Sequence, residues 1–88
     1  MDDQLEALRR FDHELRDFND ELRRALADLD RRYQGTVTVW DDSVRRTLGA
    51  RIEEARGPVD HYLRHDAEAF ERFITERIRR LHRYLHGR

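Results

Sequence analysis

Apolar residues recur at steps of three and four along the first third of the chain, the spacing that places them on one face of a helix. The residues between them are mostly Asp, Glu and Arg. The stripe ends just before Gly35, and glycine suits the left-handed conformation in which many helices end. The pattern therefore predicts a first helix over about residues 3–34, roughly 48 Å long. Its apolar members are Leu5, Leu8, Phe11, Leu15, Phe18, Leu22, Leu26, Leu29 and Tyr33.

A second stripe with helical spacing fills the other half of the chain. From Ile52 onward its steps average about 3.67 residues, the period of a nearly straight helix. Gly57-Pro58 interrupts the segment, and proline removes a backbone hydrogen bond and crowds the preceding turn. Because the stripe keeps its phase, the sequence predicts one second helix over about residues 42–86, kinked at Gly57-Pro58. Its apolar members are Val44, Leu48, Ile52, Ala55, Val59, Leu63, Ala67, Phe70, Ile74, Ile78, Leu81 and Leu85.

The two helical segments are joined by an elbow at residues 35–41. Thr36 to Val39 are all β-branched, which disfavours helix, and no second strand is available to pair with them. We therefore expect an extended elbow, with strand pairing between two molecules as the alternative, after which Asp41, Asp42 or Ser43 caps the next helix. Residues 1–88 then form a single helical-hairpin domain of fold class all-α, with two long antiparallel helices.

A lone hairpin buries one stripe against the other and leaves the flanks of both stripes exposed to water. Small chains with thin cores commonly compensate by oligomerising. We expect two hairpins to assemble into a dimeric four-helix bundle, formed by the chain with itself or with a similar helical protein.

Charge supports the helical interpretation. Charged residues make up 42% of the chain, against about 25% in an average globular protein. The net charge is only -1, which argues against general nucleic-acid binding. An acid precedes an Arg by four residues at eight places, the orientation that stabilises a helix. The pairs are Glu6/Arg10, Asp12/Arg16, Asp20/Arg24, Asp28/Arg32, Asp42/Arg46, Asp60/Arg64, Glu68/Arg72 and Glu76/Arg80.

Composition removes several function classes. The chain has no Cys, so it has neither disulfides nor thiolate metal ligands. It has no Lys, which removes Schiff-base chemistry. No apolar run approaches the roughly 18 residues of a membrane span. The acidic start lacks the apolar region of a signal peptide, so we expect a cytoplasmic protein, with export without a cleaved signal left open.

Few residues stand out as candidates for chemistry. His61, His65 and Glu68 share a helix face, but that face points to water and reads as polar surface. Asn19 lies at the margin of the first stripe, where a polar residue either is half-exposed or fixes the register of the helices or the choice of partner. We expect no catalytic residue, no metal and no cofactor, and hence no enzyme and no small-molecule substrate.

The single Trp, Trp40, lies in the elbow, where its ring is expected to fill the wedge between the diverging helices. This layout resembles the WXG-type proteins of type VII secretion systems, small helical hairpins with a Trp-x-Gly elbow. The resemblance implies dimeric four-helix bundles and a role as a secreted factor or as a partner of larger effectors. This chain has Asp42 where that family has Gly. Tyr62 and Asp66 match the family's Tyr-x-x-x-Asp/Glu export string, but in mid-helix and not after the second helix.

The sequence thus predicts a non-enzymatic protein–protein interaction module, a WXG-like secretion-associated partner or adaptor. An alternative is a regulatory or nucleic-acid-associated helical module that uses the Arg-rich segment 77–88. Large apolar side chains dominate such interfaces. The expected interface residues are Phe11, Phe18, Leu22, Trp40, Leu63, Phe70, Phe73, Ile74, Ile78 and Leu81.

Overall fold

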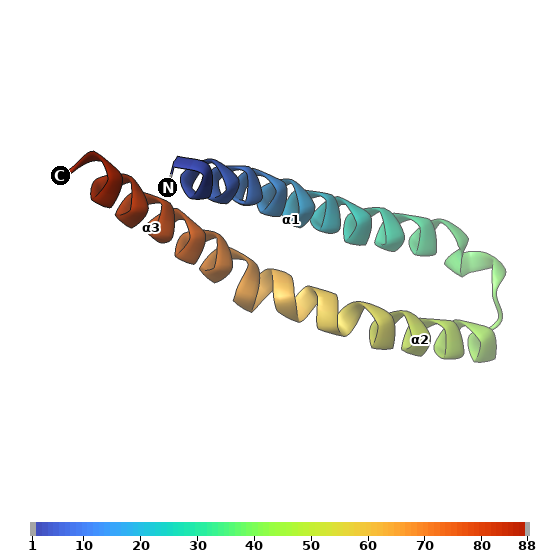
Figure 1. The fold of residues 1–88 in the computed structure, drawn as a ribbon. Helices are drawn as coiled ribbons and strands as arrows, with labels where there is room; N and C mark the ends of the chain where they lie inside the picture. Colours follow the sequence, from blue (N-terminus) through green and yellow to red (C-terminus); the bar gives the residue numbers. More distant parts are fainter. Residues whose placement is uncertain (1, 88) are drawn as a thin grey trace.

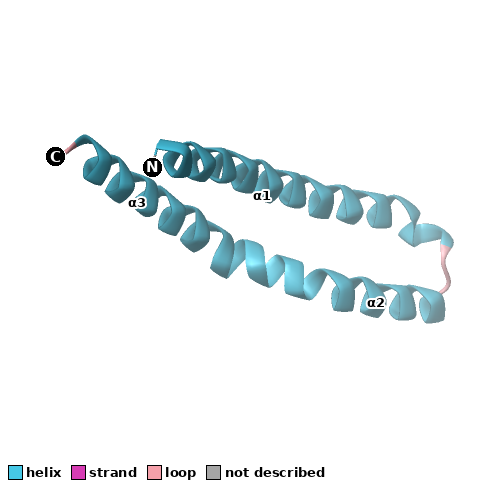
Figure 2. Ribbon diagram, in the orientation of Figure 1, coloured by secondary structure: helices cyan, strands magenta, loops and turns pink. Residues whose placement is uncertain are grey.

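The computed structural model describes residues 2–87 of the chain, and the side chains of residues 3–87. Within this range the chain is helical and contains no strand (Figures 1 and 2). Two long helical arms lie side by side and run in opposite directions, as the hydrophobic pattern predicts. The elements are α1 (Asp2–Thr36), the 3₁₀ turn η1 (Val37–Val39), α2 (Asp42–His61), the π-helical segment η2 (Tyr62–Asp66) and α3 (Ala67–His86).

The second arm is a succession of three helical elements with no other residue between them. α2 contains Pro58, and the helix continues past it to His61. The next five residues, Tyr62 to Asp66, form the π-helical turn η2, and α3 follows directly. The hairpin measures 66 × 18 × 14 Å, so it is one helix thick throughout. Both ends of the described chain lie at the same end of the hairpin (Figure 1).

The elbow differs from the predicted extended segment. α1 continues through Gly35 to Thr36, and Gly87 is the only residue in the described range with a positive φ, so Gly35 is not left-handed. The Thr36 hydroxyl donates to the Tyr33 carbonyl (3.1 Å), which satisfies an acceptor in the last turn. Val37–Val39 then form a 3₁₀ turn, and only Trp40 and Asp41 are extended. The β-branched residues disfavour a long helix but allow this single tight turn.

The capping groups at the other helix ends follow simple rules. The Asp41 side chain accepts a hydrogen bond from the Val44 N–H (2.9 Å), so Asp41 is the N-cap among the three expected candidates. Gly87 closes α3 in the left-handed conformation, with φ at 71°, and its N–H donates to the Arg83 carbonyl.

The core lies where α1 packs against α3, in the half of the hairpin that holds the chain ends. α2 contains no buried residue. In the elbow half, the contacts between the arms include the Arg56–Asp30 ion pair (2.9 Å) and the hydrogen bond that the Tyr33 hydroxyl donates to the Arg45 carbonyl (3.4 Å). The buried residues are Leu5, Leu15, Asn19, Ala67 and Ile74.

Candidate helix-binding face

Four phenylalanines remain exposed on one side of the hairpin. Phe11 is 42%, Phe18 54%, Phe70 39% and Phe73 60% exposed. Phe11 and Phe18 are two turns apart and so share a side of α1, and the Phe11 and Phe70 rings lie 6.1 Å apart across the seam. We call these four residues the Phe face. Large apolar side chains gathered on one side of a small protein are typical of an interaction surface.

A groove runs along one end of the Phe face, between α1 and α3. Its volume is 740 Å³. Its apolar lining includes Leu8, Phe11, Phe73 and Leu81, while guanidinium groups border it. The full lining is Gln4, Ala7, Leu8, Phe11, Phe73, Ile74, Arg77, Arg80 and Leu81. The groove arises because the apolar stripe of each helix is wider than the seam in which the two helices meet.

The expected interface residues are distributed over three environments. Phe11, Phe73, Ile74 and Leu81 meet at the groove, where Ile74 forms its buried floor. Ile78 lines a different depression, between Arg9 of α1 and residues of α3. The remaining members outside the groove are the exposed Phe18, Phe70 and Trp40 and the half-buried Leu22 and Leu63.

Trp40 is 39% exposed, so its ring is only partly covered and does not fill a closed wedge. Its backbone helps to fix the elbow, because its N–H donates to the Val37 carbonyl (3.4 Å) and its carbonyl accepts from Arg45 Nη2 (3.0 Å). Val39 beside it is 76% exposed. The elbow therefore presents a second, smaller apolar surface at the far end of the molecule from the groove.

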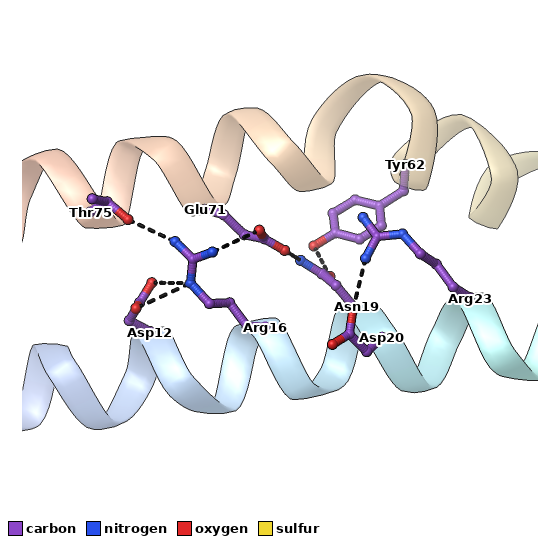
Figure 3. A network of polar contacts seen from close by, with 8 residues as sticks. All are labelled: Asp12, Arg16, Asn19, Asp20, Arg23, Tyr62, Glu71 and Thr75. Atoms are coloured by element: carbon purple, nitrogen blue, oxygen red, sulfur yellow. Dashed lines mark hydrogen bonds and ion pairs between the residues drawn. The ribbon is translucent and has the colours of Figure 1, made fainter.

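The seam between the arms contains a fully buried polar residue, Asn19, which is 0% exposed. Its Oδ1 accepts a hydrogen bond from the Tyr62 hydroxyl (2.7 Å), and its Nδ2 donates to Glu71 Oε2 (2.7 Å) (Figure 3). A buried amide without partners would destabilise the fold, so these two bonds determine which residues of the arms face each other. Asn19 is therefore buried between the arms and is not half-exposed.

Glu71 connects this buried bond to a surface network centred on Arg16. Arg16 donates through Nη1 to Glu71 Oε1 (3.2 Å) and through Nη2 to Thr75 Oγ1 (2.8 Å), both on α3. Its Nε donates to Asp12 Oδ1 (3.2 Å) on its own helix (Figure 3). Arg16 lies five residues after Phe11, a rotation of about 140° on a helix, so the network and the Phe face lie on different sides of the hairpin.

The π-helical segment η2 begins at Tyr62, the residue whose hydroxyl reaches Asn19. A π turn contains one residue more than an α turn, and it changes the direction of the side chains near it. Tyr62 is consequently half-buried and oriented toward α1, not toward solvent (Figure 3). The Tyr62-x-x-x-Asp66 string coincides with this segment, and its tyrosine is used inside the hairpin.

Metal-ligating side chains occur as pairs on the outer surface. The rings of His61 and His65 lie 4.6 Å apart, and those of His82 and His86 lie 4.4 Å apart. Over residues 2–87 no group of three or more His, Cys, Asp or Glu side chains is arranged to hold a metal ion. No helix in the same range is long and apolar enough to span a membrane.

One surface carboxylate has a perturbed titration. The side-chain hydrogen bonds from Arg32 (2.8 Å) and Arg31 (2.7 Å) hold the pKa of Asp28 below its ordinary value. Asp28 lies on α1 in the elbow half, away from the Phe face. It therefore stabilises the helix locally and is not a candidate for acid–base chemistry.

The fold and the site together define a helical hairpin with one apolar and one polar side. Comparison of the chain with protein-family models, with curated proteins and with solved structures gives no match. The functional assignment therefore depends on the geometry of the two sides.

Proposed function

We propose that this chain is a non-enzymatic interaction module that binds partner helices through its Phe face. The main observation behind this proposal is that four exposed phenylalanines lie on one side of the seam between the arms. The Arg16 network occupies the other side of that seam. The Phe11 and Phe70 rings contact each other within the hairpin, but a large part of each of the four side chains stays in contact with water and is available to a partner. Helices packed on the Phe face would complete a four-helix bundle.

The surface area of the hairpin supports this proposal. Its accessible surface is 7001 Å², whereas a compact monomer of 10.8 kDa exposes about 5,500 Å² by the usual scaling with mass. A stable interface buries about 800 Å² on each partner. The excess surface is thus sufficient for one interface of ordinary size, formed with a second copy or with a similar hairpin.

A secretion-associated role as a WXG-like partner or adaptor is the cellular setting that we propose for this module. The supporting features are the helical-hairpin layout and the position of Trp40 in the elbow. A kink at Gly57-Pro58 is part of the same proposal, because Pro58 lies inside α2, where its ring removes a backbone hydrogen bond and crowds the preceding turn. Under this proposal the chain acts in the cytoplasm or is exported without a cleaved signal.

Light scattering after size exclusion tests the helix-binding function, with the chain alone and mixed with the protein encoded by the neighbouring gene. We expect a complex in one of the two samples, and we expect Phe18→Glu and Phe73→Glu to reduce it to the 10.8 kDa monomer. Both residues are more than half exposed, so neither substitution should unfold the hairpin.

Val39→Glu is the matched control, because Val39 is equally apolar and 76% exposed but lies at the elbow. It should leave the complex intact. Complexes that survive both phenylalanine substitutions, or a chain that stays monomeric in both samples, would contradict the proposal. Circular dichroism of each variant confirms that the helices are retained.

A further inference from the structure

A shallow basic depression lies on the polar side of the hairpin, near the chain ends. It has a volume of 350 Å³ and combines Arg9 of α1 with residues of α3. Phe11 and Phe73 line the other groove, and none of the residues around this depression belongs to the Phe face. The full lining is Arg9, Thr75, Ile78, Arg79, His82 and Arg83.

The guanidinium groups of the depression are only partly neutralised. No carboxylate lines it, and Arg79 is the one member with an ion-pair partner within the described range, Glu76 at 2.9 Å. The neighbouring carboxylates of Asp12 and Glu71 are already bound by Arg16. Arg9 and Arg83, which line the depression from two different helices, therefore have no carboxylate partner within the described range.

Charge is also distributed unevenly along the hairpin, and the excess of arginine lies at the end that contains the depression. The segments 3–10 and 76–87, which lie together at one end, contain six Arg and three carboxylates. The adjoining segments 11–24 and 60–72 contain nine carboxylates and five Arg. The basic end is thus bordered by an acidic middle, although the net charge of the whole chain is close to zero.

We propose that this depression binds a short polyphosphate chain, either free or as part of a nucleotide. Arginine forks and a hydroxyl donor match phosphate oxygens, and Arg9, Arg83 and Thr75 supply these groups. The acidic middle repels a long polyanion that follows the hairpin, and the only aromatic ring in the lining, that of His82, already lies against the ring of His86, with 4.4 Å between the ring centroids. A compact anion therefore fits better than nucleic acid, and its binding is independent of the Phe face.

Isothermal titration of the full chain with tripolyphosphate, at physiological salt, tests this proposal. We expect saturable binding that weakens by about tenfold in Arg9→Gln and in Arg83→Gln, as expected for the loss of a charge-assisted hydrogen bond. Arg46→Gln is the matched control, since Arg46 is exposed, has no ion pair in the described range and lies near the elbow. It should leave the affinity unchanged.

Titrations with ATP, sulfate and a short DNA duplex complete the experiment. ATP binding as tight as that of tripolyphosphate would support a nucleotide as the ligand, whereas much weaker ATP binding would support free polyphosphate. The proposal is overturned if tripolyphosphate does not saturate, if sulfate binds equally well, or if Arg46→Gln weakens binding as much as the other variants. Tighter binding of the duplex per phosphate would also overturn it, in favour of nucleic acid.

Discussion

The Tyr62 hydroxyl donates a 2.7 Å hydrogen bond to the Oδ1 of Asn19, and Tyr62 is also the residue at which the second arm changes from α- to π-helix. The only fully buried polar side chain and the only irregularity within the second arm of the described hairpin are thus in direct contact. The bond aligns residues 43 positions apart in the chain. It therefore specifies the register of the arms where apolar contacts alone would allow them to slide.

The first prediction concerns this bond. Tyr62→Phe leaves the buried Asn19 Oδ1 without a donor and should lower the free energy of unfolding by about 1–2 kcal/mol. Asn19→Ala removes two bonds and leaves a small cavity, so it should cost about 2–3 kcal/mol. The double variant should cost less than the sum, with a coupling of about 1 kcal/mol.

Urea denaturation at one fixed protein concentration measures all three values. Tyr84→Phe is the matched control, because Tyr84 is 72% exposed and its loss of a hydroxyl should change stability by less than about 0.5 kcal/mol. Strictly additive effects of Tyr62→Phe and Asn19→Ala would show that the two side chains do not interact.

The second prediction concerns the extra residue of the π turn. Deleting the exposed His65 from η2 should convert the segment to regular α-helix and keep α2 and α3 in phase, at a cost of about 1–2 kcal/mol, which is that of the Tyr62–Asn19 hydrogen bond. Deleting Arg72 from α3 should instead rotate the following residues by about 100° away from the seam and destabilise the hairpin severely. Thermal melts followed by circular dichroism compare the stability of the two deletion variants. Equal decreases in melting temperature would contradict the interpretation that η2 contains one extra residue.

The third prediction uses the two glycines at the ends of helices. Gly35 is helical with open space around its Cα, so Gly35→Ala should stabilise the hairpin by roughly 0.5–1 kcal/mol. Gly87 has a φ of 71°, so Gly87→Ala should destabilise the end of α3. The melting temperatures should move in opposite directions. A loss of stability in Gly35→Ala would mean that α1 ends in the left-handed conformation after all.

The fourth prediction concerns pH. The pKa of Asp28 is lowered in the folded state by Arg32 and Arg31, so its ion pairs contribute stability above the unfolded-state pKa of about 3.9, and this contribution disappears as the pH falls through the lower, folded-state value. Asp28→Asn should therefore melt at a lower temperature than the parent chain at neutral pH and at the same temperature in strong acid. Because the group is at the surface, added salt should reduce the difference.

The fifth prediction concerns Trp40. Because 39% of its surface is exposed, Trp40→Ala should cost about 1–2 kcal/mol, less than the truncation of a buried tryptophan. As the only tryptophan, it also reports on its own surroundings. Its fluorescence should be quenched appreciably by iodide, and a protected ring would show that the elbow is covered.

The helices were predictable because apolar stripes over residues 5–33 and 44–85, with steps mostly of three and four, have no other regular interpretation. The conformation of the elbow was not predictable. β-branched residues disfavour a helix by an amount that grows with its length, and Val37–Val39 form only one turn. Gly35 was misassigned because a glycine permits the left-handed conformation but does not require it. The bond from Thr36 to Tyr33 allows α1 to continue beyond it.

The site was only partly predictable. Phe11, Phe18 and Phe70 belong to the predicted stripes and Phe73 flanks the second one, but a stripe does not show which of its edges faces the other arm. Asn19 lies at the margin of the first stripe, and this margin, where Leu15 and Asn19 are both buried, faces the second arm. The π turn that directs Tyr62 toward Asn19 leaves no signal in a pattern of apolar residues.

The surface ion pairs could also be predicted only in part from the sequence. Asp12/Arg16, Asp28/Arg32, Asp60/Arg64 and Glu76/Arg80 form at the predicted spacing of four. Asp20 and Asp42 instead bind an arginine three residues away, Arg23 and Arg45. Adjacent arginines compete for one carboxylate, and the difference in energy between the two spacings is small.

The location of the buried residues determines how the hairpin opens. Terminal segments usually exchange their amide hydrogens fastest, but here the buried side chains lie in the half that contains both chain ends, and α2 has none. Amide protection should therefore be lowest near the elbow and rise toward Ile74. Local unfolding then separates α2 from α1 while α1 and α3 stay paired. The hairpin therefore opens from the elbow and not from the ends of the chain.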